Sequence, residues 1–359
     1  MTVDNHIGTP PAKRRLSPWL AGMFLCLALV VVASASLASG YLDIGVADIA
    51  GLFRSKAIGS PVLLDEAAAV TIWEVRLPRI LTALVCGAAL ALSGAVFQGL
   101  LLNPLADPYT LGVSSGAAFG ASGTVILGLL FPGAALFAEP WAMTLGAFAA
   151  ASLTLAAVIL LAQDADRRLS PTNLILAGVI LSAILSAAIS FVKYLAGDQV
   201  ESIVFWLLGS FQARTWADAG VIIVFFIPAL FVSLWSAVDL NIMTMGARAA
   251  ETLGVNTKRV RLSLLAAVSL AAAAAVSVSG VIGFVGLIVP HLVRILAGPD
   301  HRSLLPLSAL GGALLLSLAD MAVRSWLPGE IPVGVLTALL AGPAFLVIFR
   351  KRMAGRDNG

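Results

Sequence analysis

The sequence predicts an all-α, polytopic membrane protein that forms a single domain over residues 1–359. Hydrophobic residues make up 60% of the chain and charged residues 11%, whereas soluble proteins are about half apolar and a quarter charged. Apolar stretches of the roughly 20 residues that a spanning helix requires recur along the chain, with room for about ten spans. So few charges cannot cover the surface of a soluble enzyme or a nucleic-acid-binding protein, and both classes are excluded.

The first span is expected at Trp19–Ala38, after three basic residues at positions 13–15. Residues 33–35 resemble a signal-peptidase site, but the apolar part of a signal peptide is roughly 7–15 residues long. The run here is longer. We therefore expect a retained span that follows a cytoplasmic tail of residues 1–18.

The remaining spans follow from apolar runs separated by short polar connections. A short apolar piece at Ile203–Leu208 is not counted, and the eighth span is expected to be short because irregular backbone at Ser279-Gly280 precedes it. Such backbone is tolerated in a membrane only where protein buries it or where it lines a cavity. The expected spans are Pro78–Leu102, Leu111–Phe131, Trp141–Leu161, Thr172–Tyr194, Ala219–Val238, Arg261–Ser279, Val281–Leu296, Leu304–Met321 and Pro332–Phe349.

The distribution of positive charge predicts the orientation. With a cytoplasmic amino terminus, 15 of the 22 Lys and Arg residues are cytoplasmic, as the positive-inside rule requires. The even number of spans returns residues 350–359 to the cytoplasm as a tail. The longest outside segment, 40–75, has room for a surface helix, and the longest cytoplasmic connection is the polar loop 239–260.

Sequence motifs for catalysis are missing. The chain has no GxxxxGK[ST] phosphate-binding loop, no GxSxG elbow and no HExxH pair. Cys26 and Cys86 lie inside apolar runs, and the three His residues are too scattered for usual metal-ligand spacing. We expect a chain that is not an enzyme and that holds no metal or cofactor.

Several stretches are more specific than composition. Arg76-Leu-Pro-Arg79 opens the second span, and long motifs follow at Gly87–Ala121, Ser279–Ala313 and Leu327–Gly334. Through these motifs the chain resembles the FecCD-type permeases, the membrane subunits of ABC importers for iron-siderophores, haem and cobalamin.

The resemblance implies a cobalamin-permease-like fold, the type II ABC importer fold, in a bacterial inner membrane. It implies a homodimer or a pair with a close paralogue, two separate ATPase subunits that bind ATP and Mg, and a periplasmic substrate-binding protein. The cargo it favours is an iron-siderophore, with cobalamin or haem as the alternative. An ion-coupled secondary transporter is a remote alternative, because such proteins need intramembrane carboxylates and only Asp320 is a clear candidate.

The resemblance also places binding-protein docking on outer-rim arginines, which suit carboxylate partners. The alternative is that these side chains reach the membrane interface without a partner protein, or that Asp320 pairs with the arginine four residues later on its own helix. The three candidates are Arg76, Arg79 and Arg324.

The loop Met245–Arg259 matches the coupling helices of the family, which contact the ATPase subunits. Its glycines allow turns, three apolar residues form a small knob, and an acidic residue adds a polar contact. An ordinary amphipathic connector is the alternative. The candidates are Gly246, Ala249, Ala250, Glu251, Leu253 and Gly254.

Small polar residues recur every four positions in the fifth span and so lie near one helix face. They either line a wide pathway or let two helices pack closely. The family places the cytoplasmic gate in the turn before this span, where a proline replaces the expected small polar residue. With a glutamine of the second span, the candidates are Gln98, Ser170, Pro171, Thr172, Ser182, Ser186 and Ser190.

Overall fold

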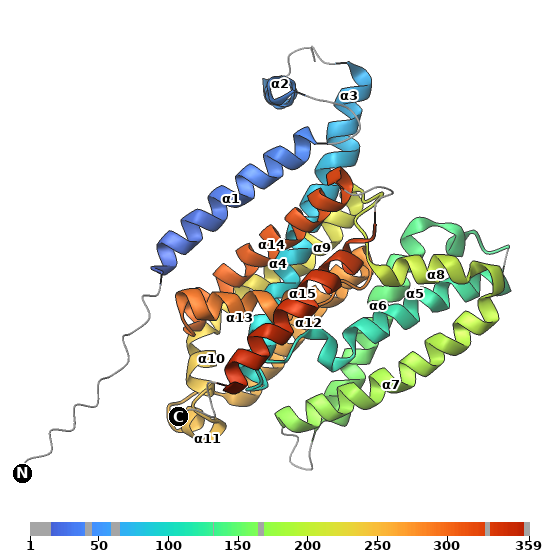
Figure 1. Ribbon diagram of the computed structural model, residues 1–359. Coiled ribbons are helices and arrows are strands. Elements are labelled where there is room, and N and C mark those ends of the chain that lie inside the picture. The colour runs from blue at the N-terminus through green and yellow to red at the C-terminus, as the bar shows by residue number, and fades with distance from the viewer. Residues whose placement is uncertain are drawn as a thin grey trace, which may run out of the picture.

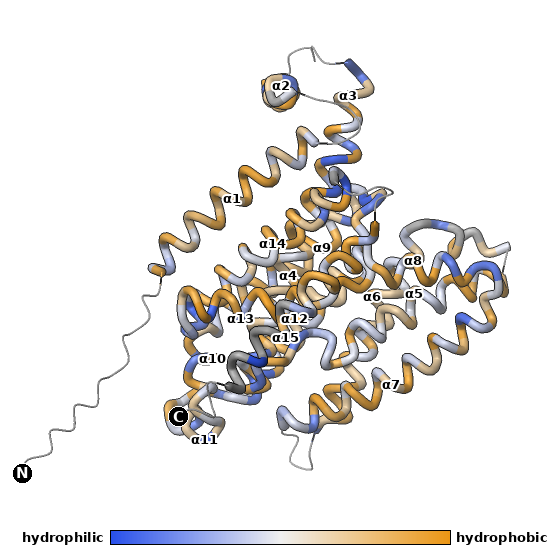
Figure 2. The backbone as a smooth tube through the Cα atoms, in the orientation of Figure 1, coloured by the Kyte–Doolittle hydropathy of each residue, from blue (hydrophilic) through white to orange (hydrophobic). Residues whose placement is uncertain are grey.

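The fold is helical throughout the residues that the computed structural model describes, which are 16–39, 45–58, 65–131, 133–163, 169–326 and 331–354. Within these ranges eight helices are long and apolar enough to cross a membrane, and two shorter apolar helices accompany them. The prediction of an all-α protein with about ten spans is therefore confirmed. The long helices run roughly alongside one another, and Figure 2 shows apolar residues along most of their length.

The helix α4 (Leu77–Leu100) lies at the centre of the fold (Figure 1). It packs against α14 (His301–Trp326), α12 (Thr257–Ser279), α13 (Val285–Ala297) and α9 (Trp216–Trp235).

Glycine permits two close approaches of other helices to α4. A Cβ at Gly87 would overlap the carbonyl of Gly312 on α14, and one at Gly94 would overlap the carbonyl of Gly286 on α13. Close packing through small residues is how spanning helices associate without a hydrophobic difference between protein and lipid. The glycines of the second span therefore set the spacing of the central helices.

A second group of helices lies to one side of this centre (Figure 1). It comprises α5 (Val113–Leu130), α6 (Pro140–Leu161), α7 (Pro171–Ala196) and the short α8 (Val200–Leu208). The outer face of α7 exposes large apolar side chains, including Ile184 at 59% and Phe191 at 63%. Lipid or another protein chain must cover such a face, because α7 is a membrane span.

Three segments differ clearly from the sequence-based bounds, and a fourth matches the expectation of a helix in the segment 40–75. The helix that contains the second span begins at Glu66 and passes through a π-helical turn, Thr71–Arg76, before α4. The eighth span starts at Val285, because Gly280 and Phe284 take positive φ values of 72° and 69°. The last helix, α15 (Val333–Ala354), runs past the point where the cytoplasmic tail was expected to begin. The expected outside helix is α2 (Val46–Ile58).

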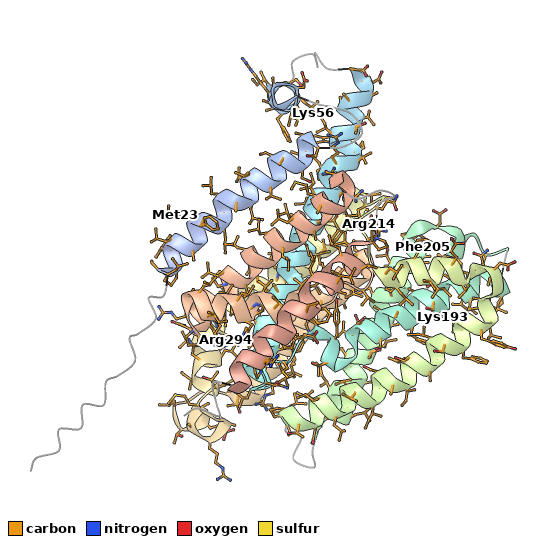
Figure 3. The ribbon with its side chains drawn as sticks, in the orientation of Figure 1. Met23, Lys56, Lys193, Phe205, Arg214 and Arg294 are labelled. Atoms are coloured by element: carbon orange, nitrogen blue, oxygen red, sulfur yellow. The ribbon has the colours of Figure 1, made fainter. Side chains whose placement is uncertain are left out.

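The two ends of the bundle carry different elements. α1 (Pro18–Ala38), α2 and the start of α4 meet at one end, which the predicted topology makes the outside. The short helices α10 (Ala237–Met243) and α11 (Ala247–Thr252) lie at the opposite end. Lys56 lies toward the first end and Arg294 toward the second (Figure 3).

Candidate functional site: a helical loop, a turn and an arginine cluster

The short helix α11 is flanked by two glycines with backbone conformations that other residues avoid. Gly246 and Gly254 have φ values of 107° and 86°. A Cβ at either position would meet nothing within 4 Å, so the requirement for glycine comes from the backbone alone. The two turns hold α11 as a separate helix at the cytoplasmic end of the predicted topology.

The exposed apolar surface of this loop differs in part from the predicted knob. Leu253 is 63% exposed and Met245 is 71% exposed, so these two side chains project from the loop. Ala250 is fully buried and Ala249 half-buried, so the prediction that Ala250 belongs to the knob is wrong. Met245 belongs to the exposed apolar surface of this loop but was not predicted. Helical periodicity does not reveal it, since it lies in the turn before α11.

The polar residue predicted for this loop makes a contact within the chain. Glu251 Oε1 accepts a hydrogen bond of 3.0 Å from the hydroxyl of Thr257, the first residue of α12. The backbone N–H of Val255 donates to the carbonyl of Ala250 at 3.0 Å. Asn256 caps α12 by accepting from the N–H of Arg259 at 3.0 Å. These bonds attach α11 firmly to the start of α12.

The predicted gate turn opens α7. Ser170 is the N-cap residue and Pro171 is the first helical residue, a position where its missing N–H costs nothing. Ser170 and Pro171 are half-buried and Thr172 is exposed. The guanidinium of Arg261, on α12, donates to the carbonyl of Leu169 directly before this turn. Sequence reasoning assigned Arg261 no site role, because the contact joins residues 92 positions apart.

Gln98, a predicted pathway residue, makes its hydrogen bonds within the chain. It is buried, and its amide NH₂ donates to the carbonyls of Gly286 and Leu287 at 3.4 and 3.3 Å. Its Oε1 accepts from Arg294 at 3.0 Å. Gln98 therefore joins α4 to α13 and lines a pocket of about 460 Å³ at the end of the bundle where α10 lies.

The predicted serine face of α7 divides into two parts. The Ser182 hydroxyl would be 3.0 Å from a Cβ on Gly112, so this part of α7 packs against the turn before α5. Ser186 and Ser190 are exposed, and the Ser190 hydroxyl bonds the Ser186 carbonyl at 3.0 Å. Close helix packing explains Ser182, while Ser186 and Ser190 belong to the face of α7 that the chain leaves uncovered.

Two of the predicted docking arginines bind the carboxyl end of α1. Arg76 donates to the carbonyls of Leu37 and Ala38, at 2.5 and 3.2 Å, and is only 4% exposed. Arg324 donates to the carbonyl and the hydroxyl of Ser36 at 2.5 and 2.6 Å. The last carbonyls of a helix have no partner within it and carry partial negative charge, which guanidinium groups stabilise.

The third arginine forms a buried ion pair. Arg79 on α4 holds Asp320 on α14, with Nε–Oδ1 and Nη2–Oδ1 distances of 3.0 Å. Their side chains are 7% and 1% exposed. An acid at this depth requires a partner. Sequence spacing favoured Arg324 for that role, whereas the structure gives Asp320 a partner on another helix.

Two carboxyl groups outside the spans show how burial and hydrogen bonding act in opposite directions. Burial raises the pKa of Asp107 to about 6, although it accepts from the N–H groups of Tyr109 and Thr110. Hydrogen bonds from the N–H of Arg302 and the amide of Asn241 lower the pKa of Asp300. Among the described residues, no three His, Cys, Asp or Glu side chains form a group that could hold a metal ion.

Comparisons with known proteins agree with this arrangement. The model of the FecCD transport family matches residues 26–351. The molybdate import system permease protein MolB of Haemophilus influenzae is 39% identical over 93% of this chain and 96% of MolB. The hemin transport system permease protein HmuU of Yersinia pestis is 38% identical over 94% of this chain and 98% of HmuU.

A solved structure has the same fold. It is described as "an inward-facing conformation of a putative metal-chelate type ABC transporter", and the two chains superpose with a TM-score of 0.79. They are 37% identical, and the match covers 93% of this chain and 99% of the other. The chain therefore belongs to the FecCD transport family and is a permease of an ABC importer.

Proposed function

We propose that this permease carries an intact iron chelate inward across the bacterial inner membrane, with both chain termini in the cytoplasm. Two separate ATPase subunits drive the cycle by binding ATP and Mg, and a periplasmic binding protein delivers the cargo. The permease contributes no catalytic residue, and a second copy or a close paralogue completes the pathway. The metal-chelate description of the structural neighbour supports this cargo class.

The observation that carries the proposal is the loop from Met245 to Gly254. It presents two exposed apolar side chains, Met245 and Leu253, at the two ends of a short helix that glycine turns flank and that a hydrogen bond joins to α12. An apolar side chain held rigidly at a solvent-facing end fits insertion into a cleft of a partner protein. We propose that Gly246, Ala249, Glu251, Leu253 and Gly254 form or hold this ATPase contact, with Ala250 anchoring it from within.

We propose a gate at the start of α7 and a pathway along the exposed face of the same helix. Ser170, Pro171 and Thr172 lie at the cytoplasmic start of α7, where a turn can open or close. The exposed face of α7, with Ser186 and Ser190, is proposed to face the second copy and the pathway between them. A face exposed in the single chain and apolar in part supports both roles.

We also propose that the binding protein docks on Arg76, Arg79 and Arg324. Docking requires each guanidinium group to exchange a partner within the chain for a carboxylate on the binding protein. Arg324 is the half-buried member and the nearest to solvent. The exchange is testable, since each arginine has a defined partner in the free chain.

A direct test uses the permease co-purified with its genomic neighbours and reconstituted in lipid. ATP hydrolysis and uptake are measured with the binding protein loaded in turn with a ferric siderophore, haem, cobalamin or molybdate. The proposal expects stimulation and uptake with the ferric siderophore. Uptake of haem alone would replace the cargo and keep the machine, which is the second candidate that the hemin relative favours. Uptake without ATP and without the ATPase subunits would overturn the machine itself.

A further inference from the structure

We propose that Arg261 is the positioning residue that transmits movement of the α10–α11 loop to the turn at the start of α7. The inference rests on the proposed function and adds a residue to it. Arg261 belongs to the second turn of α12, directly after the segment that holds α11. Its guanidinium donates across to the carbonyl of Leu169.

The first step is the connection from α11 to α12. Glu251 is hydrogen-bonded to Thr257, and Ala250 is hydrogen-bonded through its carbonyl to Val255. The first bond joins α11 to the first residue of α12, and the second holds the turn between the two helices. A displacement of α11 by a partner protein therefore moves the first turn of α12. Arg261 lies one turn further along the same helix and moves with it.

The second step is the apolar packing that the loop shares with the start of α7. Leu169 and Leu174, from the turn and the first part of α7, belong to the same buried cluster as Ala250 and Val255. Leu169 is 5% exposed and Leu174 fully buried. A packed cluster of this kind moves as a unit or changes between discrete arrangements, because interiors have little free volume. Apolar packing alone does not specify in which direction the turn moves. The hydrogen bond from Arg261 to the carbonyl of Leu169 does, because it has a fixed geometry.

The third step is the unused donor of Arg261. Its Nε–H is buried and has no hydrogen-bond partner in the described part of the chain. The side chain borders a cavity of about 360 Å³ whose lining also includes Ser170, Pro171, Met243 and Ala247. A buried donor without an acceptor is unfavourable. A second arrangement of this turn that brings an acceptor to Nε would therefore be stabilised by the same side chain.

These steps give Arg261 a role in both arrangements of the turn. One guanidinium nitrogen holds the Leu169 carbonyl in the arrangement seen here, and Nε is placed to bind a carbonyl or hydroxyl of the turn after it moves. The planar group of arginine can serve two acceptors at fixed angles, which lysine cannot. Arg261→Lys should therefore keep part of the function, and Arg261→Gln should lose it.

The experiment compares wild type, Arg261→Gln, Arg261→Lys and Arg302→Gln in lipid, with the ATPase subunits and the loaded binding protein. Arg302 is the matched control, an exposed arginine at the same end of the bundle and outside the proposed site. We expect uptake per ATP hydrolysed to fall roughly 2- to 30-fold in Arg261→Gln, the range for residues along a coupling network. Arg261→Lys should lie between, and Arg302→Gln should match wild type.

A second readout separates coupling from simple destabilisation. Thr172 is replaced by Cys in a background in which Cys26 and Cys86 are changed to Ala, and its labelling by a membrane-impermeant maleimide is measured in inside-out vesicles. In the Thr172→Cys protein that keeps Arg261, labelling should differ between the nucleotide-free and ATP-trapped states. In the same protein with Arg261→Gln, labelling should be equal in the two states. If Arg261→Gln keeps both the uptake ratio and the difference in labelling, the inference is wrong. If wild type itself shows no ATP-driven uptake, the proposed function fails first and the inference fails with it.

Discussion

The buried pair of Arg79 and Asp320 allows the sharpest prediction. Removal of the guanidinium in Arg79→Met leaves a carboxylate that is 1% exposed between two central helices. At the observed 3.0 Å, Coulomb attraction amounts to about 5.5 kcal/mol with an effective dielectric constant near 20. Loss of one partner of a buried pair costs about 3–5 kcal/mol, so we expect the free energy of unfolding to fall by that amount.

The double variant Arg79→Met/Asp320→Leu separates pairing from other causes. Both charges are gone, so its free energy of unfolding should return to within about 1–2 kcal/mol of wild type or exceed it. Unfolding is followed by circular dichroism in mixed micelles titrated with SDS. Arg302→Met, an exposed change on the same helix α14, should cost within about 0.5 kcal/mol.

Two results would refute this reasoning. A single variant that costs less than about 1 kcal/mol would mean that the pair is not buried in the assembled protein. A double variant as unstable as the single one would mean that Arg79 acts through packing. The folded double variant also tests docking, because binding-protein affinity equal to wild type would remove Arg79 from the docking proposal.

Further predictions concern the loop and one acid. Leu253→Asp should release the ATPase subunits in a pull-down while Met245→Leu retains them, because a charge cannot enter an apolar cleft unpaired; retention by both would contradict the contact. Gly254→Val should reduce transport and cost about 1–2 kcal/mol, since φ is 86° there and open space surrounds the Cβ, whereas unchanged transport would argue against a required turn. Asp107, whose pKa rises on folding from its ordinary value near 4 to about 6, binds its proton more tightly when folded. Stability should therefore fall as pH rises from about 4 to 6, and the melting temperature of Asp107→Asn, compared with wild type, should lack that part of the decline.

The spans were predictable from sequence, because a bilayer imposes one length and one composition on every helix that crosses it. The residues at which the spans begin and end were less predictable. The α13 boundary shifted because Phe284 adopts a positive φ, a conformation that L-residues with side chains rarely take and that no pattern announces. The loop glycines were identified for the right reason, since Gly246 and Gly254 do occupy positive φ.

The roles of individual side chains were harder to predict. Ala250 and Leu253 are both apolar and lie three residues apart, in α11 and at its carboxyl end, yet Ala250 is buried and Leu253 is exposed. The direction of a short helix depends on what packs beneath it, here the start of α12. Gln98 was predicted as a pathway residue from its place near the end of the second span, but its amide donates to two carbonyls of α13 and its Oε1 accepts from Arg294.

By itself the sequence determined that this chain crosses a membrane about ten times and which family motifs it carries, and it predicted an orientation. These properties follow from local composition, the spacing of glycines and the count of positive charges. Only the tertiary structure decided which charges meet. Arg79 pairs with Asp320, 241 positions away in the sequence, and Arg261 donates a hydrogen bond to Leu169, 92 positions away. Such contacts depend on which helices become neighbours, and helix packing is set by the summed fit of many small surfaces rather than by any one residue.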